Sequence, residues 1–577
     1  MINFSLDLNE QKTLWQRWVY NARNNPDREA IVHWVAGEEP FRWNYKKLID
    51  TARKYSAFIK AAGVEKDQVC AIIIRHNPFF YPIYLGVSRT GALPAVLAYP
   101  NPRLHPDKFR QGIEGMSQRS GLHYILTERE LEPLITPLVE KPGSTIKKIL
   151  FPLEWDLDNE IDYKIDSEIE AVSNSIFSSE PVLLQHSSGT TGLQKPVMLS
   201  HLAINRHITA LGKALKLTPE DKIVNWLPLY HDFGLIAAFL IPLTLGVPTV
   251  HMDPFQWVIA PVILLEAITK EKGTITCLPN FAYNIMADKI PDEELRGIDL
   301  SSVRTVLNGS EPIRHYSHQR FVDRFSKYGL KPNVLACVYG MAEITMALVV
   351  TELGKPITEL VVDRNELAKG ILKFADEYSV KRYCVSSGRL IEGCKAKVVD
   401  ENKNELSTGS VGEFVVSSQS MFDGYRNYPE KTAEVLKEGW FLSGDYGFIY
   451  NDEFFVIGRK KDIIIVAGKN IYPEDIEDAV NQAQGVIPGR VIAFGQDDET
   501  MGTELVSVVA ETKVETEAEK NKVRMAVLRA GMSIDVNISK VYLVPPRWLI
   551  KSSAGKPSRK ANKERLIEGT DPSVWSR

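Results

Sequence analysis

The sequence predicts an α/β protein: a large N-terminal domain of layered α/β subdomains with a small β-rich subdomain, followed by a small mobile α+β C-terminal domain. Its 577 residues exceed the roughly 250 to 300 at which single hydrophobic cores stop growing, so several domains are expected. Hydrophobic residues at 44% and charged residues at 25% match an ordinary globular protein. Short apolar runs alternate with helical patterns, which indicates buried strands covered by helices.

The expected elements begin with a helix at Tyr45–Ala62 and a buried strand at Val69–Ile74. The helix has an amphipathic pattern, and the strand is a short continuous apolar run. Further apolar runs of the same kind are expected to form buried parallel strands at Ile223–Pro228, Val247–Met252, Gly273–Leu278, Val303–Asn308 and Val334–Val338.

The pattern changes from about Gly388 to short alternating segments with turn residues, as in Lys395–Asp400 and Gly412–Val416. This indicates a β-rich part at about 388–458. The C-terminal residues hold two further apolar runs and a helical pattern at Glu517–Leu528, which predicts a compact α+β unit. The expected domains are therefore 1–460 and 461–577.

Composition gives no sign of a nucleic-acid partner or a secreted protein. The net charge of -4 comes from 69 basic and 73 acidic residues, so no broad field favours nucleic acid or an anionic membrane. The five cysteines are scattered and include no C-x-x-C pair, which favours a reducing cytoplasm. The first residues lack the basic and apolar regions of a signal peptide. We therefore expect a cytoplasmic protein.

One apolar stretch, Phe233–Val250, approaches the length of a transmembrane helix. It contains two glycines and two prolines, which are unfavourable inside an ordinary transmembrane helix. We interpret it as buried core and expect no stable membrane insertion.

The most informative segment is Ser187-Ser-Gly-Thr-Thr-Gly-Leu-Gln-Lys195, which follows the apolar run Pro181–Leu184. Glycines let backbone N–H groups turn toward a phosphate, while the hydroxyls and Lys195 add donors. The segment is not a P-loop, because Gln194 stands where that motif requires a glycine before the lysine. A flexible surface loop remains an alternative on composition alone.

Four further segments occur in a specific order: Leu227–Leu235, Tyr339-Gly-Met-Ala-Glu343, Ser443-Gly-Asp-Tyr-Gly447 and Gly458–Glu477. Together with the Ser187 segment and Gly555-Lys556, they resemble the adenylate-forming superfamily of acyl-CoA synthetases, adenylation domains and luciferases. The resemblance spans about Leu14 to Lys563. Considered singly, Tyr339 could be a strand-end aromatic, Asp445 a turn residue and Glu343 a helix-start carboxylate. Taken together, those readings require six coincidences.

The resemblance implies ATP and Mg²⁺ as cofactors. Ser187–Gly192 and Lys195 would wrap the β- and γ-phosphates, and Glu343 would hold Mg²⁺. Tyr339 would stack on adenine, and Asp445 and Arg459 would contact the ribose. The implied nucleotide-binding residues are Ser187, Ser188, Gly189, Thr190, Thr191, Gly192, Gly309, Ser310, Glu311, Tyr339, Gly340, Met341, Asp445 and Arg459.

The implied catalytic residues are Lys556, Lys195 and Glu343. In the superfamily the lysine that matches Lys556 bridges the substrate carboxylate and the α-phosphate during in-line displacement. On charge alone, its segment Lys551–Lys563 could instead be a solvated basic tail. A mobile lysine requires a mobile domain, and the matching hinge residue is Lys461.

The expected acyl pocket is walled by His231–Ile241 and Leu278–Tyr283, which are rich in aliphatic and aromatic side chains. An alkyl chain suits such walls. The expected substrate-binding residues are His231, Phe233, Phe281 and Asn308. His231 could orient the substrate or gate the pocket, and a packed structural role is an equal alternative.

Roughly forty residues separate Glu343 from Val385-Ser-Ser-Gly-Arg389, and they include Val361-Val-Asp-Arg-Asn-Glu-Leu-Ala-Lys-Gly370. This inserted segment, at about 351–384, looks like that of the fatty acyl-AMP ligases. In that family the insertion hinders transfer to CoA, and the acyl group goes to the phosphopantetheine of an acyl carrier protein. The resemblance thus implies a fatty acid substrate and a carrier-protein acceptor. CoA as acceptor remains an alternative, as does a family-neutral loop insertion. From another class, a protein that binds ATP or acyl-adenylate without turnover also remains.

Overall fold

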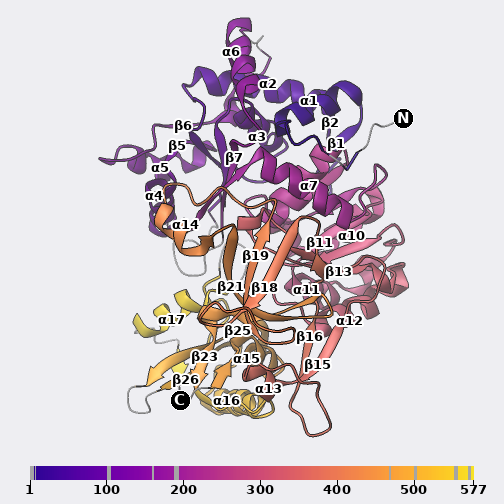
Figure 1. Ribbon diagram of the computed structural model, residues 1–577, viewed down its shortest axis with the longest axis vertical. Coiled ribbons are helices and arrows are strands. Elements are labelled where there is room, and N and C mark those ends of the chain that lie inside the picture. The colour runs from indigo at the N-terminus through magenta and orange to yellow at the C-terminus, as the bar shows by residue number, and fades with distance from the viewer. Residues whose placement is uncertain are drawn as a thin grey trace.

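The computed structural model describes residues 5–6, 8–100, 106–158, 162–187, 194–466, 469–498, 503–551, 557–568 and 574–576. Within these ranges the chain is a mixed α/β protein, as predicted (Figure 1). The N-terminal helices lie at one end of the long axis, and the C-terminal strands and helices lie at the other.

A nine-stranded sheet forms the centre, in the order β17-β14-β13-β12-β11-β9-β10-β1-β2. Its pairs from β1 to β13 are parallel, and β2, β14 and β17 pair antiparallel at the two edges. The five apolar runs predicted to form parallel strands all lie in it, so that prediction is confirmed. The strands are β1 Glu29–Trp34, β2 Phe41–Asn44, β9 Ile223–Asn225, β10 Thr249–Met252, β11 Ile275–Leu278, β12 Thr305–Asn308, β13 Leu335–Tyr339, β14 Val349–Val350 and β17 Arg389–Leu390.

A smaller parallel sheet, β4-β3-β5-β6, comprises β4 Leu93–Val96, β3 Val69–Ile73, β5 Leu122–Thr127 and β6 Lys148–Leu150. Next to it, β7 Pro181–His186 and β8 Pro196–Ser200 pair as an antiparallel hairpin. The helix predicted at Tyr45–Ala62 is α2, Tyr45–Ala61, which begins where the Asn44 side chain accepts the Lys47 N–H. The other helices of this part are α1 Leu14–Asn24, α3 Phe80–Arg89, α4 Pro106–Ser120, α5 Glu132–Val139, α6 Tyr163–Ser175 and α7 His201–Ala214.

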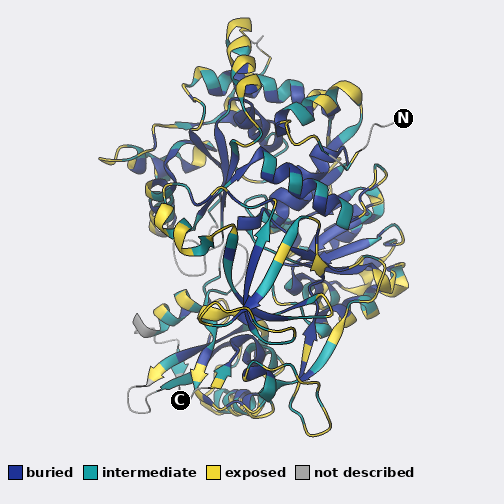
Figure 2. Cartoon of the chain, in the orientation of Figure 1, coloured by how far each residue is buried: buried dark blue, intermediate teal, exposed yellow. Residues whose placement is uncertain are grey.

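The apolar stretch Phe233–Val250 lies inside the protein, as predicted. It forms a π-helix, η3 Phe233–Leu240, which continues into α8 Ile241–Leu245, and every residue of both is buried. Figure 2 shows that buried residues fill the interior, while exposed residues lie mainly on the outer helices and loops. Across the described ranges, no helix has both the length and the apolar character needed to cross a bilayer. The helices that follow are α9 Pro254–Ile259, α10 Val262–Glu271, α11 Asn280–Lys289 and α12 His315–Phe325.

The β-rich part is a five-stranded sheet of β18 Cys394–Val399, β19 Gly412–Ser418, β20 Leu436–Lys437, β21 Trp440–Tyr450 and β22 Glu453–Arg459, with α14 Pro429–Val435 beside it. The inserted segment forms a separate antiparallel hairpin of β15 Glu359–Asp363 and β16 Lys381–Val385, with α13 Arg364–Ala368 between them.

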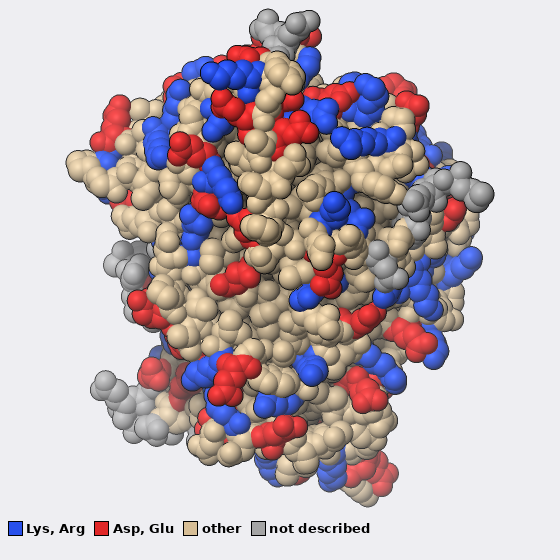
Figure 3. All heavy atoms as spheres, turned by 45° about the horizontal axis from the view of Figure 1, so that its top comes forward, with Lys and Arg blue, Asp and Glu red and all other residues tan. Residues whose placement is uncertain are grey.

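The C-terminal residues have a core of their own, formed by side chains such as Ile476, Val508 and Val527. The mobility and boundary of this part stay predictions. Its elements are β23 Ile464–Val466, β24 Lys469–Ile471, α15 Pro473–Asn481, β25 Val486–Asp498, β26 Thr503–Thr512, α16 Glu517–Met532, β27 Ile538–Val544, α17 Arg559–Glu568 and β28 Trp575–Ser576. Basic and acidic side chains are interspersed on the face seen in Figure 3, in keeping with the balanced composition.

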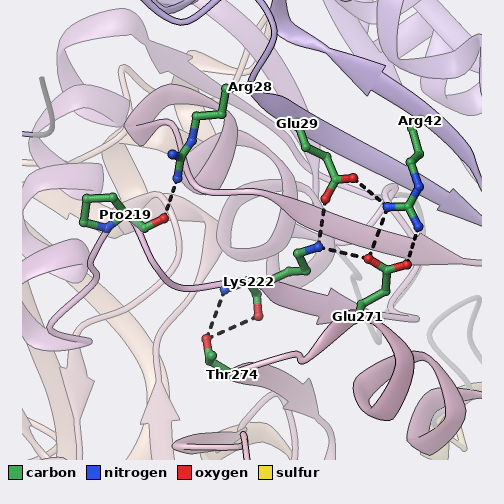
Figure 4. Close-up of polar contacts among 7 residues, drawn as sticks. All are labelled: Arg28, Glu29, Arg42, Pro219, Lys222, Glu271 and Thr274. Atoms are coloured by element: carbon green, nitrogen blue, oxygen red, sulfur yellow. Dashed lines mark hydrogen bonds and ion pairs between the residues drawn. The ribbon is translucent and has the colours of Figure 1, made fainter. Parts of the chain in front are cut away.

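Two carboxylates and two cations tie the edge of the central sheet to its middle (Figure 4). Glu271, at the end of α10, lies 2.6 Å from Arg42 of β2 and 2.9 Å from Lys222, which precedes β9. Glu29 of β1 binds the same two cations at 2.6 and 2.8 Å. Burial alone would raise the pKa of Glu271, but the hydrogen bonds from Arg42 and Lys222 hold that pKa below its ordinary value.

We expect Glu271→Gln to lower the free energy of unfolding by about 2 kcal/mol, because it removes the charge that both cations share. Glu271 is 7% exposed, so water replaces the lost contacts poorly. Urea unfolding measures the loss. As a control, Asp50→Asn breaks the exposed Lys46–Asp50 pair and should have almost no effect. Equal effects of the two substitutions would contradict this account.

Two buried histidines predict a loss of stability in acid. Burial lowers the pKa of His201 and of His207 to about 3. Both rings act as neutral acceptors, since His201 Nδ1 accepts the Leu14 N–H at 3.0 Å and His207 Nε2 accepts the Ala347 N–H at 3.2 Å. Because the folded pKa lies below the unfolded value of 6.5, their contribution is complete above pH 6.5 and is lost as pH falls toward 3.

The melting temperature should therefore fall as pH is lowered below 6.5. Each ring contributes up to about 3 kcal/mol of that loss by roughly pH 4. His207→Gln should reduce the slope of melting temperature against pH. An unchanged slope in His207→Gln would contradict the assignment.

Candidate active site

Three predicted nucleotide-binding residues meet where the central sheet borders the β-rich part. Tyr339 ends β13, and its hydroxyl donates to Asp445 Oδ2 at 2.8 Å. Asp445 lies on β21 opposite Arg459 of β22, and Arg459 Nε lies 3.2 Å from Asp445 Oδ1. The Asp445 carboxylate raises the pKa of Arg459. Asp445 is buried, whereas the Arg459 side chain is half-exposed. The Asp445 carboxylate is therefore a hydrogen-bond acceptor near an accessible edge.

A second chain of contacts joins Lys195, which precedes β8, to Glu343 of the short helix η7 Ala342–Ile344. Lys195 Nζ donates to the Tyr425 hydroxyl at 3.3 Å, and this hydroxyl donates to Glu343 Oε1 at 2.6 Å. Burial lowers the pKa of Lys195, and the Glu343 carboxylate opposes that shift. A cation and a buried carboxylate thus share one tyrosine hydroxyl.

The hydroxyl-rich segment is the loop of the β7–β8 hairpin. The Ser187 N–H donates to the Lys195 carbonyl at 3.0 Å, directly beyond the His186–Pro196 pair of the ladder. Ser188, Gly189, Thr190, Thr191 and Gly192 lie outside the described residues, so their phosphate contacts stay predictions.

The remaining predicted nucleotide residues lie on the turns after β12 and β13. A side chain at Gly340 would collide with the Met346 carbonyl oxygen, so only glycine fits between Tyr339 and Met341. Gly309 is equally restricted, since an added Cβ would lie 2.5 Å from Val338 Cγ1. Ser310 follows with φ 69°, and Glu311 Oε2 accepts the Phe281 N–H at 3.0 Å.

The predicted acyl-pocket residues border these turns. The Phe233 ring lies near Gly309, where an added Cβ would be 3.6 Å from Phe233 Cε1. Phe281 is the second residue of α11 and is half-buried. His231 Nδ1 lies 2.7 Å from Asp232 Oδ1 at the start of the π-helix. Asn308 is fully buried and lies 2.7 Å from His318 Nε2, which favours a packing role for its amide.

Two C-terminal segments approach the same edge. Lys461 lies on η8 Lys460–Asp462, and this helix directly follows Arg459. Partial burial, together with the Arg459 and Lys195 cations, lowers the pKa of Lys461 to about 8. Lys551 pairs with Pro557 across the loop that carries Lys556. Burial lowers the pKa of Lys551 to about 8, and the Glu311 carboxylate opposes that shift. Lys556 itself lies outside the described residues, so its role stays a prediction.

Tyr425 is the site residue that the sequence reasoning missed. It belongs to no glycine-rich or charged motif. It contacts Lys195 and Glu343, which lie 230 and 82 residues earlier in the sequence. We expect Tyr425→Phe to slow pyrophosphate exchange about tenfold, because the lysine and the carboxylate lose their shared hydroxyl. Tyr428→Phe, in the same segment, is the matched control and should leave the rate unchanged.

Comparison with known proteins yields a consistent set of matches. A family model described as AMP-binding enzyme matches residues 18–426. A probable long-chain-fatty-acid--AMP ligase, FadD30, of Mycobacterium tuberculosis is 28% identical over 94% of this chain and 95% of its own length. The medium-chain-fatty-acid--[acyl-carrier-protein] ligase JamA of Moorena producens is 28% identical over 97% of this chain and 96% of its own.

Solved structures match over almost the whole chain. A structure from work on fatty acyl-adenylate ligases of E. coli and L. pneumophila has a TM-score of 0.86 at 22% identity, covering 98% of this chain and 99% of that one. A fatty acyl-adenylate ligase from L. pneumophila, in complex with acyl adenylate and pyrophosphate, has a TM-score of 0.71 at 25% identity, covering 98% and 97%. The first match shows a shared fold.

Proposed function

The chain belongs to the AMP-binding enzyme family, and we propose that it activates a fatty acid with ATP and loads the acyl group onto a carrier protein. The family match covers residues 18–426. The observation that carries the proposal is the pair of contact chains, Lys195–Tyr425–Glu343 and Tyr339–Asp445–Arg459. The first chain suits a triphosphate and its metal, and the second suits a ribose.

In the first step, a carboxylate oxygen attacks the α-phosphorus, the bond from this phosphorus to the bridging oxygen breaks, and pyrophosphate leaves. Acid–base catalysis contributes little, since the carboxylate is already ionised at neutral pH. Lys195 binds the departing phosphates, and Lys556 stabilises charge between the carboxylate and the α-phosphate. In the second step, a carrier thiol attacks the acyl carbon and AMP leaves.

Glu343 fits a magnesium ligand. It is a buried carboxylate, and among the described residues its one side-chain hydrogen bond comes from the Tyr425 hydroxyl. Magnesium in nucleotide sites is usually held by one or two carboxylates and by the substrate's phosphates. When bound there, it would neutralise charge on the phosphate oxygens.

Acid-dependent pyrophosphate release, with fatty, aromatic and amino acids offered separately, tests the adenylation step. We expect release with fatty acids and detection of acyl-AMP by mass spectrometry. Release with amino acids alone would overturn the fatty-acid assignment. No release with any acid would favour the alternative of a protein that binds nucleotide without turnover.

The inserted hairpin supports a carrier protein as acceptor, because it contacts the C-terminal part. Arg382 of β16 lies 3.1 Å from Asp475 of α15, and its guanidinium lies over the Tyr472 ring at 5.0 Å. Arg364 of α13 lies 3.8 Å from the same carboxylate and donates to the Ile534 carbonyl at 3.3 Å. These contacts oppose rotation of the C-terminal part before thiol transfer, and we propose that a docked carrier protein releases them whereas CoA alone does not.

Offering CoA and a phosphopantetheinylated carrier protein in parallel tests the acceptor. We expect thioester on the carrier alone, and we expect the double variant Arg364→Gln, Arg382→Gln to gain transfer to CoA. Deleting the whole insertion is a poorer test, since Val362 and Leu367 form part of a core cluster. Lys369→Ala, on the exposed face of the insertion, is the control. Efficient CoA transfer by the unaltered protein would make it an acyl-CoA synthetase.

A further inference from the structure

We propose that the stacked indoles of Trp226 and Trp257 form the end wall of the acyl pocket and set the longest acyl chain that the enzyme accepts. The inference rests on the proposed function, because it assigns the substrate's alkyl chain to this pocket.

The two indoles lie on segments that follow neighbouring strands of the central sheet. Trp226 directly follows β9, and Trp257 lies on α9, shortly after β10, which pairs in parallel with β9. Their ring centroids are 3.6 Å apart and the ring planes differ by 14°. Trp226 is 4% exposed and Trp257 is fully buried. Two large flat side chains therefore lie beyond the carboxyl ends of these strands, the edge at which parallel sheets bind ligands.

Phe281 joins this stack to the nucleotide edge. Its ring meets both indoles edge-on, with centroids 6.0 Å from Trp226 and 6.3 Å from Trp257. Its N–H donates to Glu311, on the turn predicted to line the adenine pocket. Phe281 is half-buried, whereas the indoles behind it are covered. An alkyl chain that extends past Phe281 from the reacting carboxylate would end against the stack.

Hydrogen bonding does not explain where the indoles lie. Within the described ranges, neither the Trp226 nor the Trp257 indole N–H has a hydrogen-bond partner, although both are buried. Buried tryptophan N–H groups usually have one. The role of the pair is steric, because its stacked rings block the pocket.

The helix that carries Trp257 has exposed apolar side chains on its outer face. Trp257 is the buried residue of α9, while Phe255, Val258 and Ile259 of the same six-residue helix are 48%, 58% and 84% exposed. Removing the Trp257 indole would open the pocket toward these apolar side chains. A longer alkyl chain could then occupy the volume that the indole leaves beneath α9, so the substitution should favour long chains specifically.

The test compares kcat/KM for pyrophosphate release with hexanoic, decanoic, tetradecanoic and octadecanoic acids. For each protein, kcat/KM for the next longer acid is divided by kcat/KM for the longest acid that the unaltered protein accepts. For Trp257→Ala we expect this ratio to rise by at least about tenfold. Trp257→Leu serves as a second variant in case the alanine protein does not fold. Trp18→Ala removes a fully buried indole from α1 and controls for general destabilisation.

An unchanged chain-length profile in both Trp257 variants, with an active unaltered protein, would overturn the end-wall assignment and leave the proposed function standing. Failure of the unaltered protein with every fatty acid would instead refute the proposed function. An equal shift in Trp18→Ala would also count against the assignment, because it would show that the profile follows stability.

Discussion

Replacing Lys556 by alanine is expected to reduce acid-dependent ATP–pyrophosphate exchange by about a thousandfold while leaving ATP binding nearly intact. The ammonium group is needed only as charge develops between the carboxylate and the α-phosphate, so its loss affects the transition state and not the bound nucleotide. The ends of its loop, Lys551 and Pro557, pair with each other, and Lys551 lies within the electrostatic influence of Glu311.

The control for this experiment is Lys560→Ala. Lys560 lies on α17, where it is half-exposed and pairs with Glu564. Exchange kinetics and an ATP-binding titration should separate the two variants. Full residual exchange in Lys556→Ala would remove the lysine from the mechanism, and equal losses in both variants would indicate a general effect of positive charge.

The second large effect is expected for Asp445→Asn, which should raise the KM for ATP about a hundredfold through two weakened hydrogen bonds to the ribose. Its amide oxygen can still accept from the Tyr339 hydroxyl, so the fold should persist. Asp452→Asn is the matched control, since Asp452 lies in the turn between β21 and β22 with φ 63°, which asparagine tolerates. A normal KM for ATP in Asp445→Asn would place the ribose elsewhere.

The parallel strands were predictable because both faces of a parallel sheet are buried, so each strand is a continuous apolar run. The predicted runs Val69–Ile74 and Val303–Asn308 differ from β3 and β12 by one or two residues at their ends. The π-helix Phe233–Leu240 was not predictable. Every one of its residues is buried, so the sequence shows no periodicity that could distinguish a π-helix from an α-helix or a strand.

The candidate site was predictable where its residues lie in ordered motifs, such as Tyr339, Glu343 and Asp445. Tyr425 and the Trp226–Trp257 stack were not, because each depends on contacts between segments far apart in sequence. Motif resemblance assigns residues to a ligand. It does not show which neighbouring side chains hold those residues in place or close the pocket behind them.

We propose that Lys195, from the N-terminal part, and Lys556, from the C-terminal loop, contact the same bound ATP, Lys195 at the departing phosphates and Lys556 at the α-phosphate. The most direct test is lysine labelling followed by mass spectrometry, with and without ATP or a non-reactive acyl-adenylate analogue. We predict that ATP protects Lys195, that both ligands protect Lys556, and that Lys560 is labelled as before. Labelling of Lys556 at the same rate with and without both ligands would contradict the account.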